Sequence, residues 1–234
     1  MELTEEQKSI LLALCIGDGC LRKPHPKSGN VQLEIGHSIK QEVYCIWKRD
    51  LIYSIFGGKK PPKIGYKEIK LKGYDKTYQA CRFTKSHPYF TYLRNLLYPN
   101  NVKVMTREIL DKLTLQGIAI WFMDDGSFYK KDNEDGTKSI CFDLRISTDS
   151  FTKEENEIIV DYFKEKWGIN FYVFQGHKER KEHSWIIRAN KEATIKFIDL
   201  ISPYVIPEMR YKIEYKKGNS VQECETSKID EDIV

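Results

Sequence analysis

The sequence has no Cys-x-x-Cys pair, although it contains six cysteines, at positions 15, 20, 45, 81, 141 and 224. Their spacing also forms no zinc-like group with the five histidines. The chain therefore shows neither a thiol redox motif nor the spacing of a zinc site. Unpaired cysteines behave as small hydrophobic residues, so we expect reduced and mostly buried thiols. This pattern predicts a reducing compartment.

Long apolar runs are also missing, and the longest fall well short of the roughly 20 residues that a membrane-spanning helix needs. The first residues, Met-Glu-Leu-Thr-Glu-Glu-Gln, contain no basic segment of the kind that opens a secretory signal. We therefore expect no membrane partner and an intracellular location. Both the cytoplasm and an organelle matrix fit, the latter also after import and processing.

The net charge is small, +4 from 38 basic and 34 acidic residues, but its distribution is uneven. Residues 218–234 contain five acids and one base, which leaves 37 basic against 29 acidic residues, or +8, in the rest of the chain. A basic body favours a polyanionic partner. We expect residues 218–234 to form a flexible acidic tail.

One apolar stretch, residues 117–126, reads Gly-Ile-Ala-Ile-Trp-Phe-Met-Asp-Asp-Gly and ends in two carboxylates and a glycine. An exposed helix would show a polar stripe at the 3.6-residue period, so this run predicts a helix buried on all sides. Residues 11–19, Leu-Leu-Ala-Leu-Cys-Ile-Gly-Asp-Gly, repeat the element. Converging buried acids are costly, and a divalent cation is their usual compensation. The two runs therefore make the point where two helices end a candidate metal site, and an ordinary helix-end acid before glycine is the alternative for Asp18.

The residues after each run follow one plan: helix, two strands, helix, two strands, helix. Capping boxes predict helix starts, and alternating polarity predicts strands. The capping pairs are Thr4 with Gln7, Ser38 with Gln41, and Thr152 with Glu155, and further helices are expected from Ser86–Pro88 and from Asn190. Strands are expected at 31–35, 68–72, 78–84, 140–147, 171–175 and 185–189, with a polar loop at 130–138.

We therefore predict an α+β fold of two pseudo-symmetric αββαββα repeats with antiparallel sheets. The repeats are expected at 1–99 and 114–217, joined by a connection at 100–113. Neither repeat can bury its apolar first helix alone, so the two helices should pack against each other at the repeat interface. Small residues would permit their close approach, namely Ala13, Gly17 and Ala119.

These two runs resemble the motif of the LAGLIDADG homing endonucleases, in their single-chain form with two motif copies. Residues 11–19 resemble the first copy and 118–126 the second, and Asp18 and Asp125 stand 107 positions apart. Residues 203–212 and 100–103 resemble the segments that close each half in this family. The resemblance implies a monomer whose sheets form a DNA-binding saddle, and it implies cleavage of a long asymmetric target.

The resemblance also implies site residues. It makes Asp18 and Asp125 ligands of Mg²⁺, aided by the backbone carbonyls of Gly17 and Asp124, with Lys103 and Lys212 as the basic residue near each site. Glu34 would order water at the first site. Its counterpart, within a residue of register, is Arg145, which cannot ligate a metal and so departs from the family pattern. We expect Mn²⁺ to substitute for Mg²⁺, and Ca²⁺ to bind without supporting cleavage.

Phosphodiester hydrolysis must activate water and stabilise negative charge, which one or two carboxylates, a divalent ion and a lysine can provide. Two-stranded ribbons fit the major groove, so the strands would meet the duplex and the loops its phosphates. The strand residues expected on that face are Gln32, Lys70, Lys72, Arg82, Arg145 and Arg188. The loop residues expected to bind phosphates are Arg22, Lys23, Lys27, Lys178, Arg180 and Lys181.

Three function classes are open. The first is a metal-dependent, site-specific double-strand DNA endonuclease. The second is an RNA-binding splicing cofactor, or maturase, with intron RNA as its partner. The third is a sequence-specific DNA-binding protein without catalysis. The pair Asp18 and Asp125 argues against the third class, because a protein that only binds DNA does not need paired buried acids. It argues only weakly against the second, because cleavage and splicing activities can coexist.

Overall fold

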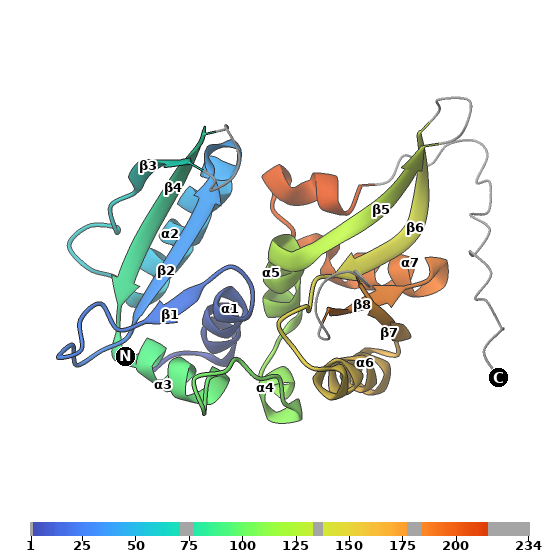
Figure 1. Cartoon of the computed structure of the whole chain (residues 1–234), viewed down its shortest axis with the longest axis horizontal. Coiled ribbons are helices and arrows are strands. Elements are labelled where there is room, and N and C mark those ends of the chain that lie inside the picture. The colour runs from blue at the N-terminus through green and yellow to red at the C-terminus, as the bar shows by residue number, and fades with distance from the viewer. Residues whose placement is uncertain (1, 71–76, 133–137, 177–183, 215–234) are drawn as a thin grey trace.

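The computed structural model describes residues 2–70, 77–132, 138–176 and 184–214, with side chains for all of these except 128–132 and 138–142. Four predicted DNA-contacting residues lie outside the described residues, namely Lys72, Lys178, Arg180 and Lys181. The predicted tail, 218–234, also lies outside them. Figure 1 shows two sheets on either side of a central pair of helices, α1 and α5.

The first repeat runs from α1 to α3. Its helices are α1 (Glu5–Ile16), α2 (Glu42–Phe56) and α3 (Pro88–Leu97), and a 3-10 helix, η1 (Ile39–Gln41), precedes α2. Its strands are β1 (Cys20–Arg22), β2 (Gln32–Ser38), β3 (Gly65–Lys70) and β4 (Thr77–Ser86). They form an antiparallel sheet in the order β1-β2-β4-β3.

The second repeat has the same topology. Its helices are α5 (Leu115–Asp125), α6 (Lys153–Trp167) and α7 (Lys191–Ile201), and its strands are β5 (Gly126–Asp132), β6 (Lys138–Ile146), β7 (Phe171–Gln175) and β8 (Trp185–Ala189). The sheet order is β5-β6-β8-β7, again antiparallel. A short helix, α4 (Arg107–Asp111), lies in the connection, and two 3-10 helices, η2 (Ser202–Tyr204) and η3 (Pro207–Lys212), follow α7. The predicted α+β fold with two pseudo-symmetric repeats is confirmed.

The two motif helices pack against each other along their buried faces, as their lack of a polar stripe predicts. Residues 9–16 of α1 and 117–123 of α5 are all buried. Glycines permit close approach near both ends of the contact. A β-carbon at Gly117 would lie 2.2 Å from Ser9 Oγ, and one at Gly17 would lie 2.3 Å from Asp124 Oδ2. The expected role of Gly17 is confirmed, whereas that of Gly117 was not anticipated.

Three of the predicted helix starts agree with the capping residues in the sequence. Thr4 and Thr152 form complete capping boxes, and Asn190 caps α7. Two expected starts are wrong. Ser38 caps η1 instead of α2, which begins at Glu42 without a side-chain cap. His87 caps α3, because Ser86 is still paired in β4.

Two strand predictions also need correction. The predicted loop at 130–138 overlaps β5, which continues to Asp132. In β3 the register pairs Gly65 with Arg82 and Lys70 with Thr77. Side chains alternate between faces along a strand, so Lys67 shares the face of Arg82, and Lys70 lies on the opposite face. Lys70 was expected beside Arg82 on the assumption that Ile69 points to the core. Ile69 instead shares the outer face, so the predicted face is inverted.

The buried apolar side chains form one core that includes both motif helices and the inner faces of both sheets. Cys15, Cys45 and Cys81 are buried and Cys20 is exposed, and all four thiols are free. This agrees with the expectation of reduced, mostly buried cysteines. No helix in the described part of the chain is both long and apolar enough to span a bilayer.

Candidate functional site

Asp18 and Asp125 stand at matched positions, each at the junction between a motif helix and the first strand of a sheet. α1 ends at Ile16, and Gly17 and Asp18 lead into β1. Asp125 is the last residue of α5, and β5 begins at Gly126. The two helix ends touch, because the Asp18 backbone N–H donates to Asp124 Oδ2 at 3.1 Å. The structure therefore brings the predicted acidic residues together.

The carboxylate of Asp124 is fully buried and makes contacts of its own. Lys48 Nζ lies 2.5 Å from its Oδ1, and the Tyr44 hydroxyl donates to the same oxygen at 2.6 Å. Burial raises the pKa of this carboxyl, and Lys48 opposes the rise. Asp124 was expected to offer only its backbone carbonyl. Its side chain instead joins the two repeats, because Lys48 and Tyr44 both come from α2.

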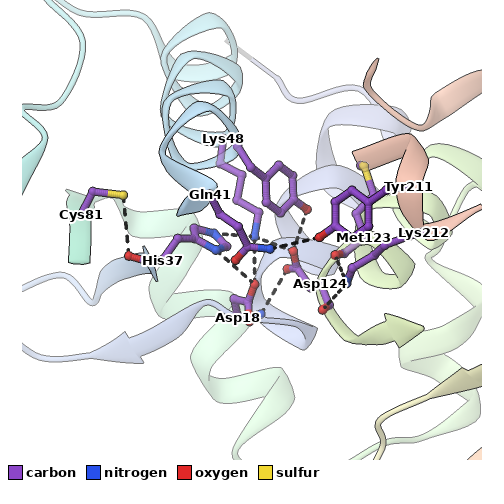
Figure 2. Close-up of polar contacts among 10 residues, drawn as sticks. Asp18, His37, Gln41, Lys48, Cys81, Met123, Asp124, Tyr211 and Lys212 are labelled. Atoms are coloured by element: carbon purple, nitrogen blue, oxygen red, sulfur yellow. Dashed lines mark hydrogen bonds and ion pairs between the residues drawn. The ribbon is translucent and has the colours of Figure 1, made fainter. Parts of the chain in front are cut away.

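Asp18 lies in a more open environment than Asp124. Its side chain is 37% exposed, with Lys48 Nζ 3.3 Å and His37 Nδ1 3.8 Å from Oδ2 (Figure 2). Partial burial acts to raise the pKa of Asp18, but the charge of Lys48 and its hydrogen bond to the carboxylate outweigh it and hold that pKa below its usual value. Asp18 is therefore an ionised carboxylate available to a cation.

His37 is neutral in this arrangement. Burial first, and then the neighbouring Lys48 ammonium, lower its pKa to about 4. Lys48 Nζ lies 3.2 Å from His37 Nε2. An ammonium group has only donors, so Nε2 must accept and the ring proton belongs on Nδ1, which faces Asp18.

Asp125 has different surroundings from Asp18. Its Oδ2 accepts a hydrogen bond from Trp121 Nε1 at 3.1 Å. Burial, followed by the charges of Asp124 and Asp18, raises the pKa of Asp125 to about 7, against the opposing effect of Lys103. Negative charge at this point is therefore only partly compensated by the protein. A divalent cation bound between the acids would remove the repulsion.

Lys103 and Lys212 occupy equivalent positions. Lys103 Nζ donates to the Ile16 carbonyl, and Lys212 Nζ donates to the Met123 carbonyl at 2.6 Å. Each lysine thus binds the carbonyl two residues before its aspartate. Lys212 also donates to the Asp124 carbonyl at 3.0 Å. Burial lowers the pKa of both lysines.

The sheet registers locate Glu34 and its counterpart. Cys20, two residues after Asp18, pairs with Glu34, and Ser127, two residues after Asp125, pairs with Arg145. Arg145 is therefore the structural equivalent of Glu34, as expected. Glu34 forms ion pairs with Arg22 and with Arg82, the latter at 3.5 Å.

The predicted DNA-contacting residues of the described strands, apart from Lys70, share outer sheet faces. In the first sheet, Arg22, which was expected in a loop, is instead the last residue of β1, where it pairs with Gln32, and Arg82 lies on the same face. In the second, Arg145, Arg188 and Tyr172 are neighbours across three strands. Arg188 Nε donates to Asp143 at 2.9 Å, and its guanidinium lies 4.5 Å from the ring centre of Phe174. Lys23 and Lys27 are exposed between β1 and β2.

The donors present suit a hard divalent cation. Among the described residues, no group of three or more histidine, cysteine, aspartate and glutamate side chains could hold a metal. Mg²⁺ needs no such group, since one or two carboxylates with substrate phosphates and water complete its octahedron. Asp18 and Asp125 supply two carboxylates, and Gly17 and Asp124 supply backbone oxygens beside them. The residues therefore fit Mg²⁺ better than a metal that needs a closed protein cage.

Sequence reasoning missed Lys48, His37 and Tyr44, although two local signals were present. Along α2 the buried positions include Cys45, Lys48, Ile52 and Ile55, so a lysine occupies the apolar stripe of the helix. Along β2, His37 continues the inward alternation of Leu33 and Ile35. A charged or titratable residue at a core position requires a buried partner.

Several known proteins resemble this chain. The RecA protein of Mycobacterium gastri is 26% identical over 215 residues, covering 90% of this chain and 48% of that protein. The probable intron-encoded endonuclease 1 of Wickerhamomyces canadensis is 30% identical over 154 residues, covering 65% and 62%. The cytochrome b mRNA maturase bI2 of Saccharomyces cerevisiae is 28% identical over 122 residues, covering 52% and 26%. The chain thus spans about half the length of the RecA proteins of Mycobacterium gastri and Mycolicibacterium flavescens.

Among solved structures, the homing endonuclease I-WcaI bound to its DNA recognition sequence shares the fold, with a TM-score of 0.72 and 23% sequence identity. The match covers 92% of this chain and 88% of that one. The model of the LAGLIDADG DNA endonuclease family matches residues 8–197, which include most of α1, all of α5 and both sheets. The chain therefore belongs to the LAGLIDADG DNA endonuclease family.

Proposed function

We propose that this chain is a monomeric, site-specific double-strand DNA endonuclease that depends on a divalent metal ion. One observation carries the proposal. Two aspartates stand at matched ends of the packed motif helices, and each has a lysine bound to the carbonyl two residues before it. Family membership supports the reaction class. The similar proteins include a probable intron-encoded endonuclease and a homing endonuclease bound to its DNA recognition sequence.

Asp18 and Asp125 would hold the metal, with the Gly17 and Asp124 carbonyls beside them. The bound cation would supply activation of water and neutralisation of charge on the phosphate. Lys103 and Lys212 are each held by a backbone carbonyl, and their burial limits how freely their ammonium groups move. This arrangement suits the stabilisation of negative charge that develops on the phosphate and the leaving oxygen. Mg²⁺ is the proposed physiological ion, with Mn²⁺ as a substitute and Ca²⁺ binding without cleavage.

The outer faces of the two sheets would meet the duplex. The residues proposed to contact DNA from the first sheet are Arg82, Lys67 and Gln32. Those from the second sheet are Arg145 and Arg188. Glu34 and Asp143 hold arginines in defined directions through ion pairs. Fixed guanidinium groups favour bidentate contacts to guanine edges over loose phosphate binding. We therefore infer that Arg82 and Arg188 contribute to site selection, whereas Lys23 and Lys27 contribute to affinity.

A selection experiment tests the proposal. Protein and Mg²⁺ are incubated with a randomised duplex library, and cleaved molecules are sequenced. One long asymmetric consensus is expected, and DNA cut at no preferred sequence would contradict the proposal. Asp18→Asn and Asp125→Asn should each abolish cleavage of that consensus while binding in Ca²⁺ survives. Asp199→Asn, the same change at an exposed position on α7, should cleave normally.

Intron RNA is a second candidate partner, because one relative is an mRNA maturase. A competition binding experiment distinguishes duplex DNA from intron RNA as the ligand. If binding of the selected duplex is displaced by equimolar structured intron RNA, the same surface serves both ligands. If RNA binds while no duplex is ever selected or cut, the maturase function replaces the nuclease function.

A further inference from the structure

Lys48 is a lysine in the core of the protein, with its side chain 0% exposed. It reaches from α2 of the first repeat to Asp124 of the second, with 2.5 Å between Nζ and Oδ1. The same ammonium lies 3.3 Å from Asp18 Oδ2 and 3.2 Å from His37 Nε2. It also lies 4.3 Å from the ring centre of Tyr44. Figure 2 shows Lys48 pointing between the two aspartates.

The fold of a repeat does not require a lysine at this position. Lys48 is the seventh residue of α2, and the seventh residue of its counterpart α6 is Ile159, which is 0% exposed. Asp124 likewise lacks a counterpart, because Gly17 takes its place in the first motif. The extra acid and the extra base thus come as a pair, one from each repeat. Lys48 and Asp124 neutralise each other, and either charge alone would be buried without a partner.

The position of Lys48 also matters for a metal ion. Its ammonium and an incoming cation would compete for Asp18, which is the more exposed of its two carboxylate partners. Asp125 differs, since its carboxylate accepts a hydrogen bond from the neutral Trp121 indole. A fixed positive charge next to one ligand opposes binding of a second positive charge there. It also holds the carboxylate in place while no metal is bound.

We propose that Lys48 is a resident counter-ion of the metal site: it neutralises Asp18 and Asp124 in the metal-free protein and sets the cation concentration at which Asp18 is occupied. This rests on the proposed function only in taking Asp18 as a metal ligand. Lys48 touches neither substrate nor metal in this account, so it is a positioning residue.

The test uses the full chain without DNA. Binding of Mn²⁺ alone is measured by the loss of the free-ion electron paramagnetic resonance signal, and thermal unfolding is followed in EDTA and in increasing Ca²⁺. Lys48→Met introduces a side chain that is apolar like Ile159, and it should lower the unfolding temperature in EDTA. Added Ca²⁺ should restore much of that loss. The Mn²⁺ dissociation constant of the variant should fall at least about tenfold, since one unit charge is removed a few ångströms from the cation.

Matched variants decide the outcome. Lys112→Met removes a surface lysine that pairs with Glu108 and should change neither quantity. Lys48→Met/Asp124→Asn removes one charge of each sign, so it should fold even if the single variant does not, with Mn²⁺ affinity near the wild type. A Lys48→Met protein that is destabilised equally in EDTA and Ca²⁺, with unchanged or weaker Mn²⁺ binding, would overturn the proposal. Equal Mn²⁺ binding by wild type and Asp18→Asn would instead refute the metal site itself.

Discussion

Replacement of Gly17 by alanine should separate the two motif helices where the active site forms. A β-carbon at Gly17 would lie 2.3 Å from Asp124 Oδ2, 2.7 Å from Asp124 Cβ and 2.9 Å from Asp124 Cγ. Asp124 cannot swing aside cheaply, because Lys48, Tyr44 and the Asp18 backbone N–H all bind its carboxylate. The helix ends must therefore move apart by about 1 Å to reach an ordinary contact of 3.4 Å.

The size of the effect follows from the crowding. Overpacking a close-packed core costs about 1–3 kcal/mol. For a chain of this length, each kcal/mol lowers the unfolding temperature by about 2–4 °C, so a fall of about 2–12 °C is expected. Cleavage should fall more than stability, because a displacement of about 1 Å at a catalytic site can cost about 100-fold in rate.

Thermal unfolding and single-turnover cleavage of the selected duplex measure the two effects. Gly29→Ala is the matched control, since a β-carbon there would meet nothing within 4 Å. The loss caused by Gly17→Ala should shrink in an Asp124→Gly background, because all three clashing atoms belong to the Asp124 side chain. A loss of the same size in both backgrounds would refute this explanation, and so would wild-type cleavage by Gly17→Ala.

Other predictions concern the lysines, the sheet faces, the metal and one helix cap. Lys103→Met and Lys212→Met should each slow cleavage about 100- to 1000-fold while DNA binding is retained. If each lysine acts on one DNA strand, each variant should accumulate plasmid that is nicked in the other strand. Arg145→Ala should weaken duplex binding. If Arg145 contacts a phosphate, the slope of log affinity against log salt concentration should also fall by about one. An unchanged affinity would show that Arg145 does not contact the DNA. EDTA should stop cleavage without releasing DNA, and added Mn²⁺ should restore it, whereas cleavage in excess EDTA would exclude a metal-dependent mechanism. Thr152→Ala should cost about 1 kcal/mol in urea unfolding, because Thr152 caps α6.

Local sequence patterns determined much of the fold, because the physics they report acts over a few residues. The all-apolar runs at 11–16 and 118–123 require burial, and both lie in buried helices. Thr4, Thr152 and Asn190 cap helices with their own side chains, so these starts were predictable. The strands at 171–175 and 185–189 were placed with their observed ends. Repetition of the motif placed Asp18 and Asp125 at matched helix ends.

Tertiary structure decided the features that depend on pairing between distant residues. Lys70 appeared to face outward because its neighbour Ile69 is apolar, yet the register with β4 sets the face and inverts that assignment. Ser38 was read as the cap of α2, but the chain turns through η1 first. Neither error could be found from composition, since strand register and chain direction follow from partners elsewhere in the chain.

The same distinction applies to the candidate site. The repeat placed the two carboxylates near one another, and the family resemblance added the two lysines. The sequence did not indicate that Asp124 would bury its carboxylate or that Lys48 would neutralise it, because those residues lie 76 positions apart and meet only when the repeats pack. A buried charge is tolerable only with its partner in place. The sequence therefore determined where the acids are, and the packing of the two repeats decided which of them is held by a lysine.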